Sequence, residues 1–432
     1  MKTGSKYYQL IPEKIYQEFS SIEISLKLKI GGYSSDHLRE VVSILSYNIR
    51  KDGKPVQLQI EYIKNLVPQG DKYLKGLRDL NIIVRSGQYI PGKSSYKYIF
   101  ARNYQSRYIS VLLRDIKLIR RIHYARAKRI KGTALLNRGH SGQSKYLRSL
   151  TINDGYYDFI KANYTGDADT VKFNLAQSSA TRILNGDIFY SVDNTSGRFH
   201  SNITNMPKGL RQFLQINGES LANIDIKNSQ PFLSILLLTN PAKVSWMTKN
   251  PDFARLLQTL KVKMSYDVKK YIDLVISGHI YEFLTDEFIK EGMELPKDPE
   301  KRRKSVKEQV LRILFAPNKM PWNETNRKAR QIFINQFPSV HRIFSKVRGN
   351  DKGDRFNSYK RFAILLQRIE SYLILEIILK RIFRELPGTI AVTIHDSIMT
   401  GIITNNVEEV SRIMKDELNH FVGYEPQIKI ER

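Results

Sequence analysis

Two apolar stretches, each ending on a carboxylate, constrain the fold of this chain more than any other feature. Residues 221–231 read LANIDIKNSQP and residues 390–397 read IAVTIHDS, so Asp225 and Asp396 each follow a run of aliphatic and β-branched side chains. Such runs predict buried strands. Strands far apart in sequence can pair side by side in one sheet, so we expect the two aspartates to lie close together.

Paired carboxylates of this kind can share two divalent ions, an arrangement that supports phosphoryl transfer. The first hypothesis is therefore a nucleotidyl transferase in which Asp225 and Asp396 are catalytic and hold two Mg²⁺ ions, with Mn²⁺ as a substitute. The alternative is that each aspartate only ends a strand and caps a turn. The residues before and between them decide between these readings.

Charge is the strongest feature of the composition. The 432 residues include 70 Lys and Arg against 42 Asp and Glu, a formal net charge of +28, which predicts a polyanionic partner such as nucleic acid. Residues 101–150 alone carry thirteen basic residues against one acidic residue, Asp115. The chain has no cysteine, no apolar leader at its start and no run of about 18 apolar residues. We therefore expect a cytoplasmic protein of a bacterial or phage-infected cell, without a membrane partner.

The first hundred residues predict a small DNA-binding domain after a lead-in of residues 1–30. Helices are expected from Ser35, as N-cap, to about 50, from about 56 to 66 and from 71 to 80, followed by the strands NIIVR and YKYIFA around a Gly/Pro turn. This order resembles a winged-helix domain, here residues 31–104. The expected phosphate contacts are Lys72, Lys75, Arg78, Arg85, Lys93 and Lys97. Winged-helix domains also bind other proteins, so the alternative is that this domain is a protein-docking module.

Residues 105–194 predict a basic, mainly helical segment that could clamp a duplex like a polymerase thumb, with loop signals at NRGHSGQS and YTGDADT. A charge-carried contact of this kind weakens steeply with salt. No acid/base chemistry is indicated in this segment.

From residue 195 onward the chain resembles the family A DNA polymerases and their single-subunit RNA polymerase relatives. Those enzymes carry a TGR-type motif, a proline-containing loop, an Arg-x-Phe and then the first catalytic aspartate. This sequence has SGR ending at Arg198, NMP ending at Pro207, RQF beginning at Arg211, and then Asp225. The resemblance implies that residues 195–432 form a palm and fingers, with fingers at about 240–330. It also implies primer or template contacts by Arg198, in the minor groove near the primer terminus, and by Arg211.

A second match lies in RKSVKEQVLRILFA, residues 303–316. The family's fingers helix reads Arg-x-x-x-Lys-x-x-x-Phe-x-x-x-Tyr-Gly, and Arg303, Lys307, Leu311 and Phe315 have the same spacing. Residues four apart lie on nearly the same helix face, so two cations and two apolar groups form one stripe. Arg303 and Lys307 could then bind a triphosphate and the apolar pair could support the base, with Lys307 also assigned a catalytic role. The alternative is a solvated amphipathic helix.

The third match is the helix expected at 367–381. The family places a glutamine there to touch template or primer, and Gln367 is the corresponding residue. Glu370 has no family counterpart and is expected to orient Arg368 or Lys307, or to lie on the surface. The last motif reads His395-Asp396-Ser397, as in the RNA polymerases, where DNA polymerases have His-Asp-Glu. The resemblance implies that His395 contacts the primer or template.

Two departures from the family concern the choice of sugar. A glutamate usually lies five residues after the first aspartate and, with a fingers tyrosine, blocks a 2′-hydroxyl. This chain has Gln230 and Phe315 at those positions. Both dNTPs and NTPs are therefore expected substrates, and Gln230 joins the nucleotide-binding residues.

The sequence predicts an α/β (α+β) protein with a right-hand palm, helical fingers, a thumb-like segment and a winged-helix domain. The expected function is a family A-like DNA polymerase of a phage or mobile element, with primase activity and no exonuclease. Its expected partners are DNA template and primer, together with a replication helicase or a small accessory subunit. The alternatives are a single-subunit RNA polymerase or primase, and a winged-helix replication initiator or regulator with an inactive palm.

Overall fold

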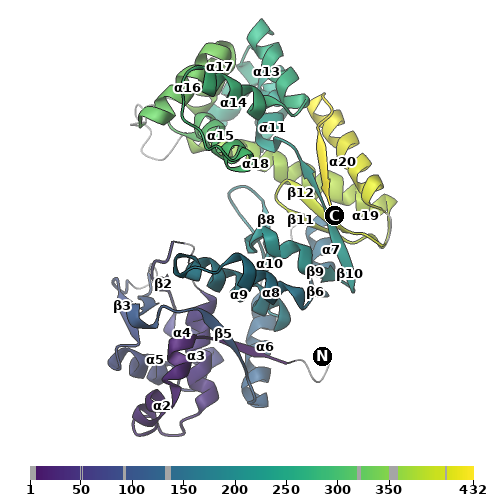
Figure 1. The fold of residues 1–432 in the computed structure, drawn as a ribbon. Coiled ribbons are helices and arrows are strands. Elements are labelled where there is room, and N and C mark those ends of the chain that lie inside the picture. Colours follow the sequence, from purple (N-terminus) through teal and green to yellow (C-terminus); the bar gives the residue numbers. More distant parts are fainter. Residues whose placement is uncertain are drawn as a thin grey trace. The chain divides into compact units, whose positions relative to one another are not determined.

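The computed structural model describes residues 6–48, 50, 52–90, 94–131, 138–318, 323–349, 359–403 and 406–432. The chain forms two compact units of mixed helix and antiparallel strand (Figure 1). The first comprises Met1–Ala134, Ser144–Ser191 and His200–Ser220, and the second comprises Leu135–Gln143, Val192–Phe199 and Leu221–Arg432. The four-part division expected from the sequence stays a prediction. Within the described ranges, no helix combines the length and apolarity needed to cross a membrane.

The N-terminal segment, expected as a short lead-in, contributes to the core of the first unit. Strand β1 (Tyr8–Pro12) pairs antiparallel with β5 (Tyr108–Leu112), and the helices α1 (Glu13–Gln17) and α2 (Phe19–Lys27) follow it. Leu10, Ile11, Ile15 and Leu26 are fully buried. A strand partner about 100 residues away gives this segment its structure.

The helices and hairpin expected within residues 31–104 are present, with two differences. Helices α3 (Ser35–Tyr47), α4 (Ile60–Leu66) and α5 (Gly70–Asp79) are followed by the paired strands β3 (Ile83–Ser86) and β4 (Lys97–Phe100). The N-cap of α3 is Ser34, whose side chain accepts a hydrogen bond from His37 N at 3.4 Å, and not Ser35. Residues 56–57, expected to begin a helix, form strand β2 (Val56–Gln57), because Val56 pairs with Tyr98 of β4 and is buried.

The basic stretch after residue 105 is mainly helical, as expected. NRGHSGQS, expected as a loop, lies largely in a helix: a Cβ at Gly142 would approach a ring carbon of Phe383 to 2.3 Å, so this glycine permits close packing. Strand β6 (Leu150–Ile152) pairs with β9 (Leu214–Ile216), which pairs with the first two residues of β10 (Glu219–Ile226). The remaining elements are η1 (Arg102–Tyr104), α6 (Ile116–Lys131), α7 (Arg138–Leu147), β6 (Leu150–Ile152), α8 (Gly155–Asn163), η2 (Asp167–Asp169), α9 (Thr170–Leu184), β7 (Tyr190–Val192), β8 (Phe199–Ser201), α10 (Asn202–Asn205), η3 (Lys208–Phe213) and β9 (Leu214–Ile216).

A buried carboxyl group in the first unit makes its stability depend on pH. Glu40 of α3 is 1% exposed and accepts hydrogen bonds from Tyr7 Oη at 3.3 Å and Gln9 Nε2 at 3.0 Å. Burial is the main cause that raises the pKa of Glu40 to about 7 from 4.5, and nearby Arg126 opposes the shift. The folded protein thus favours the protonated carboxyl. The contribution of Glu40 to stability is therefore fully present below pH 4.5 and is lost as the pH rises through 7.

We expect Glu40→Gln to remove this pH dependence, because the amide cannot ionise. From pH 5 to pH 8 the wild-type protein should lose on the order of 3 kcal/mol relative to this variant. Urea unfolding at each pH measures the difference. Glu61→Gln, at an exposed position of α4, is the matched control and should follow the wild type. Unfolding free energies that change with pH in the same way for the wild type and for Glu40→Gln would contradict the expectation.

The second unit is built on an antiparallel sheet covered by helices. The strands lie in the order β11 (Ala391–Ile394), β12 (Ser397–Gly401), β10 (Glu219–Ile226), with β13 (Ile428–Glu431) on the other side of β10. A continuous helical rod runs through α18 (Lys360–Ser371), the π-helical segment η5 (Tyr372–Ile378) and α19 (Leu379–Glu385). The other helices are α11 (Ser229–Thr239), η4 (Pro241–Met247), α12 (Pro251–Thr259), α13 (Tyr266–Ile276), α14 (Ile280–Lys290), α15 (Pro299–Phe315), α16 (Glu324–Gln336), α17 (Pro338–Arg348) and α20 (Val407–Val422).

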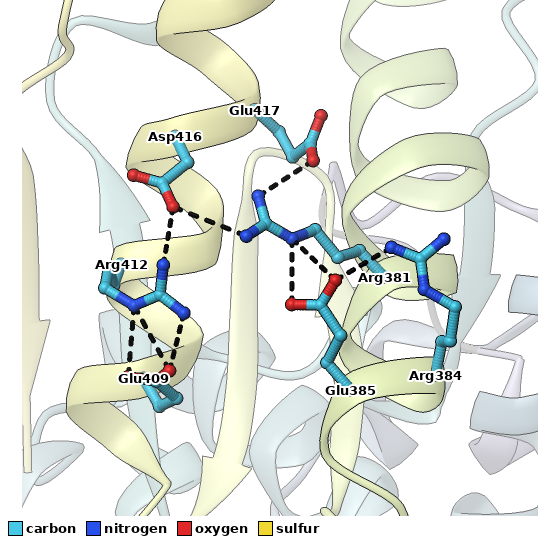
Figure 2. Close-up of polar contacts among 7 residues, drawn as sticks. All are labelled: Arg381, Arg384, Glu385, Glu409, Arg412, Asp416 and Glu417. Atoms are coloured by element: carbon cyan, nitrogen blue, oxygen red, sulfur yellow. Dashed lines mark hydrogen bonds and ion pairs between the residues drawn. The ribbon is translucent and has the colours of Figure 1, made fainter.

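An ion-pair network joins α19 to α20 (Figure 2). Arg381 contacts Glu385 on its own helix at 3.0 Å, and Glu417 and Asp416 on α20 at 2.9 and 3.5 Å. Arg412 contacts Asp416 at 2.8 Å and so extends the network along α20. Single exposed pairs contribute little to stability, but a shared network holds several side chains in place at once. The network thus fixes α20, which packs on β12, against α19.

Candidate active site

The first candidate catalytic residue lies near the end of the central strand of the second unit. In β10, Ile224 and Ile226 are buried while Asp225 between them is half-buried, as the two-residue period of a strand requires. Asp225 lies opposite Ser397 of β12 on one side and opposite Lys429 of β13 on the other. The backbone of Asp225 is therefore fixed by two neighbouring strands.

The second candidate lies in the hairpin turn beside it. Ile394 of β11 pairs with Ser397 of β12, so His395 and Asp396 form a two-residue turn, in which His395 has a φ of 56°. Two-residue hairpins favour turns with positive φ, which is uncommon for residues other than glycine. Since Ser397 lies opposite Asp225, the preceding Asp396 is a near neighbour of Asp225. The register brings the two aspartates together.

A buried hydrogen-bond network lies next to this pair. Glu370, at the end of α18, is 2% exposed. Its Oε1 accepts hydrogen bonds from Arg198 Nε at 2.9 Å and from Arg198 Nη2 at 2.6 Å. Gln230 Nε2 donates to Glu370 Oε2 at 2.6 Å, and Ser229 Oγ lies 3.5 Å from the same atom. The expectation that Glu370 orients Arg368 or Lys307, or lies on the surface, is thus corrected: Glu370 is buried and binds Arg198, whose charged hydrogen bonds offset the cost of burying the carboxyl group.

The carboxyl groups of this site affect one another. Burial is the main cause that raises the pKa of Glu370 to about 7, and the charge of Asp396 raises it further, while Arg198 opposes both. Burial also raises the pKa of Asp396, against the fields of Lys307 and Arg198 and a hydrogen bond from Ser229. Arg198 and Lys307, two of the basic residues singled out in the sequence, therefore act on Asp396.

Helix α15 presents the expected stripe. Arg303 and Lys307 are exposed, Leu311 and Phe315 are half-buried, and the opposite face of the helix is buried in the unit. Arg303 Nε makes a 2.9 Å ion pair with Glu282 Oε1, in which both side chains are 48% exposed. Exposed pairs of this kind contribute 0 to about 1 kcal/mol, so an incoming anion can displace Glu282.

Two further residues near the carboxylates carried no signal in the sequence. Tyr281 of α14 is buried, and the Arg303 guanidinium lies 5.3 Å from its ring centre. The pKa of Tyr281 is raised, mainly by burial and also by the charge of Asp396, while Arg303 opposes the shift. Ser229 opens α11 only four residues after Asp225. Tyr281 belongs to an ordinary amphipathic pattern, and nothing in that pattern distinguishes it from a core residue.

The other residues singled out in the sequence differ in burial and in the unit that carries them. Gln367 of α18 is half-buried, and Arg211 lies in η3 of the first unit. Lys93 lies outside the described residues. Of the other expected phosphate contacts of the first unit, four are exposed: Lys72, Lys75, Arg85 and Lys97. Arg78 is half-buried.

A cluster of three or more His, Asp or Glu side chains suited to a metal ion is absent from the described part of the chain. Mg²⁺ in phosphoryl-transfer sites is commonly held by one or two protein carboxylates together with substrate phosphates. Asp225 and Asp396 meet that requirement, and the burial that raises the pKa of Asp396 is a cost that a bound cation would relieve.

Comparison with known proteins gave one kind of match. No family model matches the chain, and no curated protein matches it. Among solved structures, it is similar to the POL domain of Pol1 from M. smegmatis, determined in complex with DNA primer-template and dNTP. The TM-score is 0.41 at 12% sequence identity, and the alignment covers 72% of this chain and 63% of that one, somewhat less than two thirds of the mycobacterial chain.

Proposed function

We propose that the second unit catalyses template-directed nucleotidyl transfer. The observation that carries the proposal is the strand register, which makes Asp225 of β10 and Asp396 of the β11–β12 turn close neighbours. The same unit supplies basic side chains whose fields reach Asp396, namely Lys307 and Arg198. Paired carboxylates beside cations suit a reaction in which negative charge develops on phosphate oxygens.

Asp225 and Asp396 would hold two Mg²⁺ ions, or Mn²⁺ in their place. Such ions, when bound, stabilise the attacking and leaving oxygens of an in-line displacement. Arg303 and Lys307 would bind the triphosphate as charge-assisted donors, and Leu311 and Phe315 would support the base. Phe315 is held for this task by an edge-on contact with Phe362, with ring centres 5.7 Å apart.

Arg198 would contact the primer strand, and its position depends on Glu370. Arg198 Nε and Nη2 both point to Glu370 Oε1, so the guanidinium has one fixed orientation. Gly197, with a φ of 74°, closes the turn before Arg198 through a 2.7 Å hydrogen bond to Asp193 O. Gln367, His395 and Arg211 are proposed as further contacts to primer or template.

Gln230 supports the use of both sugars. Its Nε2 donates to Glu370, whereas its buried Oε1 has no hydrogen-bond partner among the described residues. A 2′-hydroxyl could donate to that oxygen, which would make a ribonucleotide acceptable. A glutamate at this position would place a second carboxylate against Glu370, so Gln230→Glu should disturb the Arg198 network as well as the choice of sugar.

The first unit would bind duplex DNA. Its sequence of helices and its β2-β4-β3 sheet are the elements of a winged-helix domain, with α5 as the helix for the major groove and the β3–β4 hairpin as the wing. Lys72 and Lys75 on α5, and Arg85 and Lys97 on the hairpin, are exposed and could contact phosphates. The basic helices after residue 105 would add positive charge to the DNA-binding surface. The affinity for DNA should therefore fall steeply as the salt concentration rises.

A primer-extension gel tests the proposal. The full chain with Mg²⁺ should extend a primer on a template with dNTPs, and more slowly with NTPs, and the reactions should be repeated without a primer. Extension only with dNTPs would overturn the proposed role of Gln230. Tight DNA binding without any extension, in Mg²⁺ or Mn²⁺, would overturn the enzymatic proposal and favour a DNA-binding regulator.

A further inference from the structure

The second unit contains a pocket that the proposed chemistry does not use. Its volume is 360 Å³, within the size range of small-ligand sites. One wall is the 192–197 turn, which precedes Arg198, and the other walls come from the end of η4 and from the junction of α18 with η5. The residues that line the pocket include Thr195, Trp246, Lys249, Arg368, Ser371 and Tyr372.

The pocket has an aromatic platform on a rigid support. Trp246 is 61% exposed although its indole meets Tyr372 edge-on, with ring centres 5.1 Å apart. The short helix η4 that carries Trp246 begins at Pro241 and is capped by the Asn240 side chain. A large exposed indole on a fixed element is uncommon, and it leaves a stacking face available to a ligand.

Arg368 preforms the pocket by joining two of its walls. Its Nε donates to Thr195 O at 2.8 Å and its Nη1 donates to Met247 O at 2.9 Å. The 192–197 turn and η4 are thereby both hydrogen-bonded to one residue of α18. A pocket held in this way needs little ordering when a ligand enters.

One polar atom in the pocket wall lacks a hydrogen-bond partner among the described residues. Ser371 is 7% exposed, and its buried Oγ has no hydrogen-bond partner among the residues that the structure describes. A buried unpaired hydroxyl costs free energy, which a ligand atom that donates or accepts a hydrogen bond would recover. The same pocket carries the exposed ammonium group of Lys249, which adds a positive charge at the rim.

We propose that this pocket binds one unpaired nucleotide of a single-stranded nucleic acid. The base would stack on Trp246, Ser371 Oγ would bond to its edge, and Lys249 would contact a neighbouring phosphate. A strand is favoured over a free nucleoside triphosphate because the pocket offers one exposed ammonium group and no second free cation among its described lining residues to hold three phosphates. The +28 charge of the chain favours the same occupant.

The site lies next to the Arg198 network. Gly197 packs toward Ser371, since a Cβ there would lie 3.8 Å from Ser371 Cβ, and the following residue is Arg198. A nucleotide in the pocket would therefore contact the turn that positions Arg198. The inference rests on the proposed function in one respect: that function identifies the bound strand as unpaired template.

Tryptophan fluorescence tests the site directly. In a Trp322→Phe background Trp246 is the sole tryptophan of the chain. Titration without divalent ions should show saturable quenching by a single-stranded oligonucleotide, and weak or no quenching by an abasic strand of equal length or by dNTP alone. Equal quenching by the abasic strand would overturn base stacking. Stronger quenching by dNTP alone would overturn the choice of a strand as occupant.

Two variants test the named contacts with a labelled oligonucleotide. Trp246→Ala should weaken single-strand affinity by about tenfold, the size expected for one lost stacked base. Ser371→Ala should fold at least as stably and weaken affinity by about threefold, because it removes one neutral hydrogen bond. The control is Tyr266→Ala, which removes a tyrosine that is 82% exposed and does not line the pocket. Affinities equal to that of the control would overturn the proposal.

These results separate the two proposals. If the wild type extends primers but Trp246→Ala binds single strands as the control does, the pocket proposal alone fails. If Trp246 is quenched and its loss weakens binding while no extension occurs, the polymerase proposal alone fails.

Discussion

Asp225→Asn and Asp396→Asn should each abolish nucleotide incorporation while DNA binding stays close to that of the wild type. The change keeps the size of the side chain and removes the negative charge. Asp225 of β10 and Asp396 of the β11–β12 turn are near neighbours, so losing either charge would leave the other to hold the divalent ions alone. Primer extension under single-turnover conditions and filter binding of the same primer-template measure the two properties.

Asp273→Asn is the matched control for both substitutions. Asp273 is an exposed residue of α13 in the same unit, and its neutralisation changes the net charge equally. It should incorporate nucleotides like the wild type. An Asp225→Asn or Asp396→Asn variant with wild-type incorporation would show that the aspartates merely end their strands.

Lys307→Ala should lower the maximal rate of incorporation by on the order of a hundredfold, the loss typical of one preorganised donor. The field of Lys307 already reaches Asp396 in the structure, where it opposes the rise that burial causes in the pKa of that carboxyl. Its ammonium group would be needed most when charge develops on the leaving pyrophosphate, so kcat should fall more than KM rises. Steady-state kinetics over a range of nucleotide concentrations separates these effects.

Lys304→Ala provides the comparison on the same helix. Lys304 is exposed but lies off the stripe of Arg303, Lys307, Leu311 and Phe315, so its loss should change the rate little. Equal rates for the two lysine variants would mean that α15 is only a solvated amphipathic helix. Phe315→Ala should instead mainly raise the nucleotide KM, because it removes the support of the base.

Local pattern was sufficient for many elements of the fold. The β-branched runs before Asp225 and Asp396 form strands, and the spacing from Arg303 to Phe315 forms one face of a helix. The expected helices and hairpin of residues 31–104 are present as well. These features depend on the two-residue and 3.6-residue periods of strands and helices, which a sequence displays directly.

Other elements depended on contacts from distant parts of the chain. β1 exists because β5 pairs with it, and Val56 is a strand residue because Tyr98 lies opposite. Gly142 reads as a loop signal, yet it lies in α7, where Phe383 occupies the space that a side chain would need. Local propensity is overridden at such positions by packing that no local window contains.

The charge of the protein, the two strand-end aspartates and the basic stripe of α15 could be read from the sequence. The surroundings of the aspartates could not: Glu370 binds Arg198 and Gln230, and Tyr281 contacts Arg303 and is affected by the charge of Asp396. A period reveals which side of an element is buried, whereas the partner of a buried polar group is set by how distant elements pack. Glu370 and Arg198 are 172 residues apart, and no pattern within either segment indicates the other.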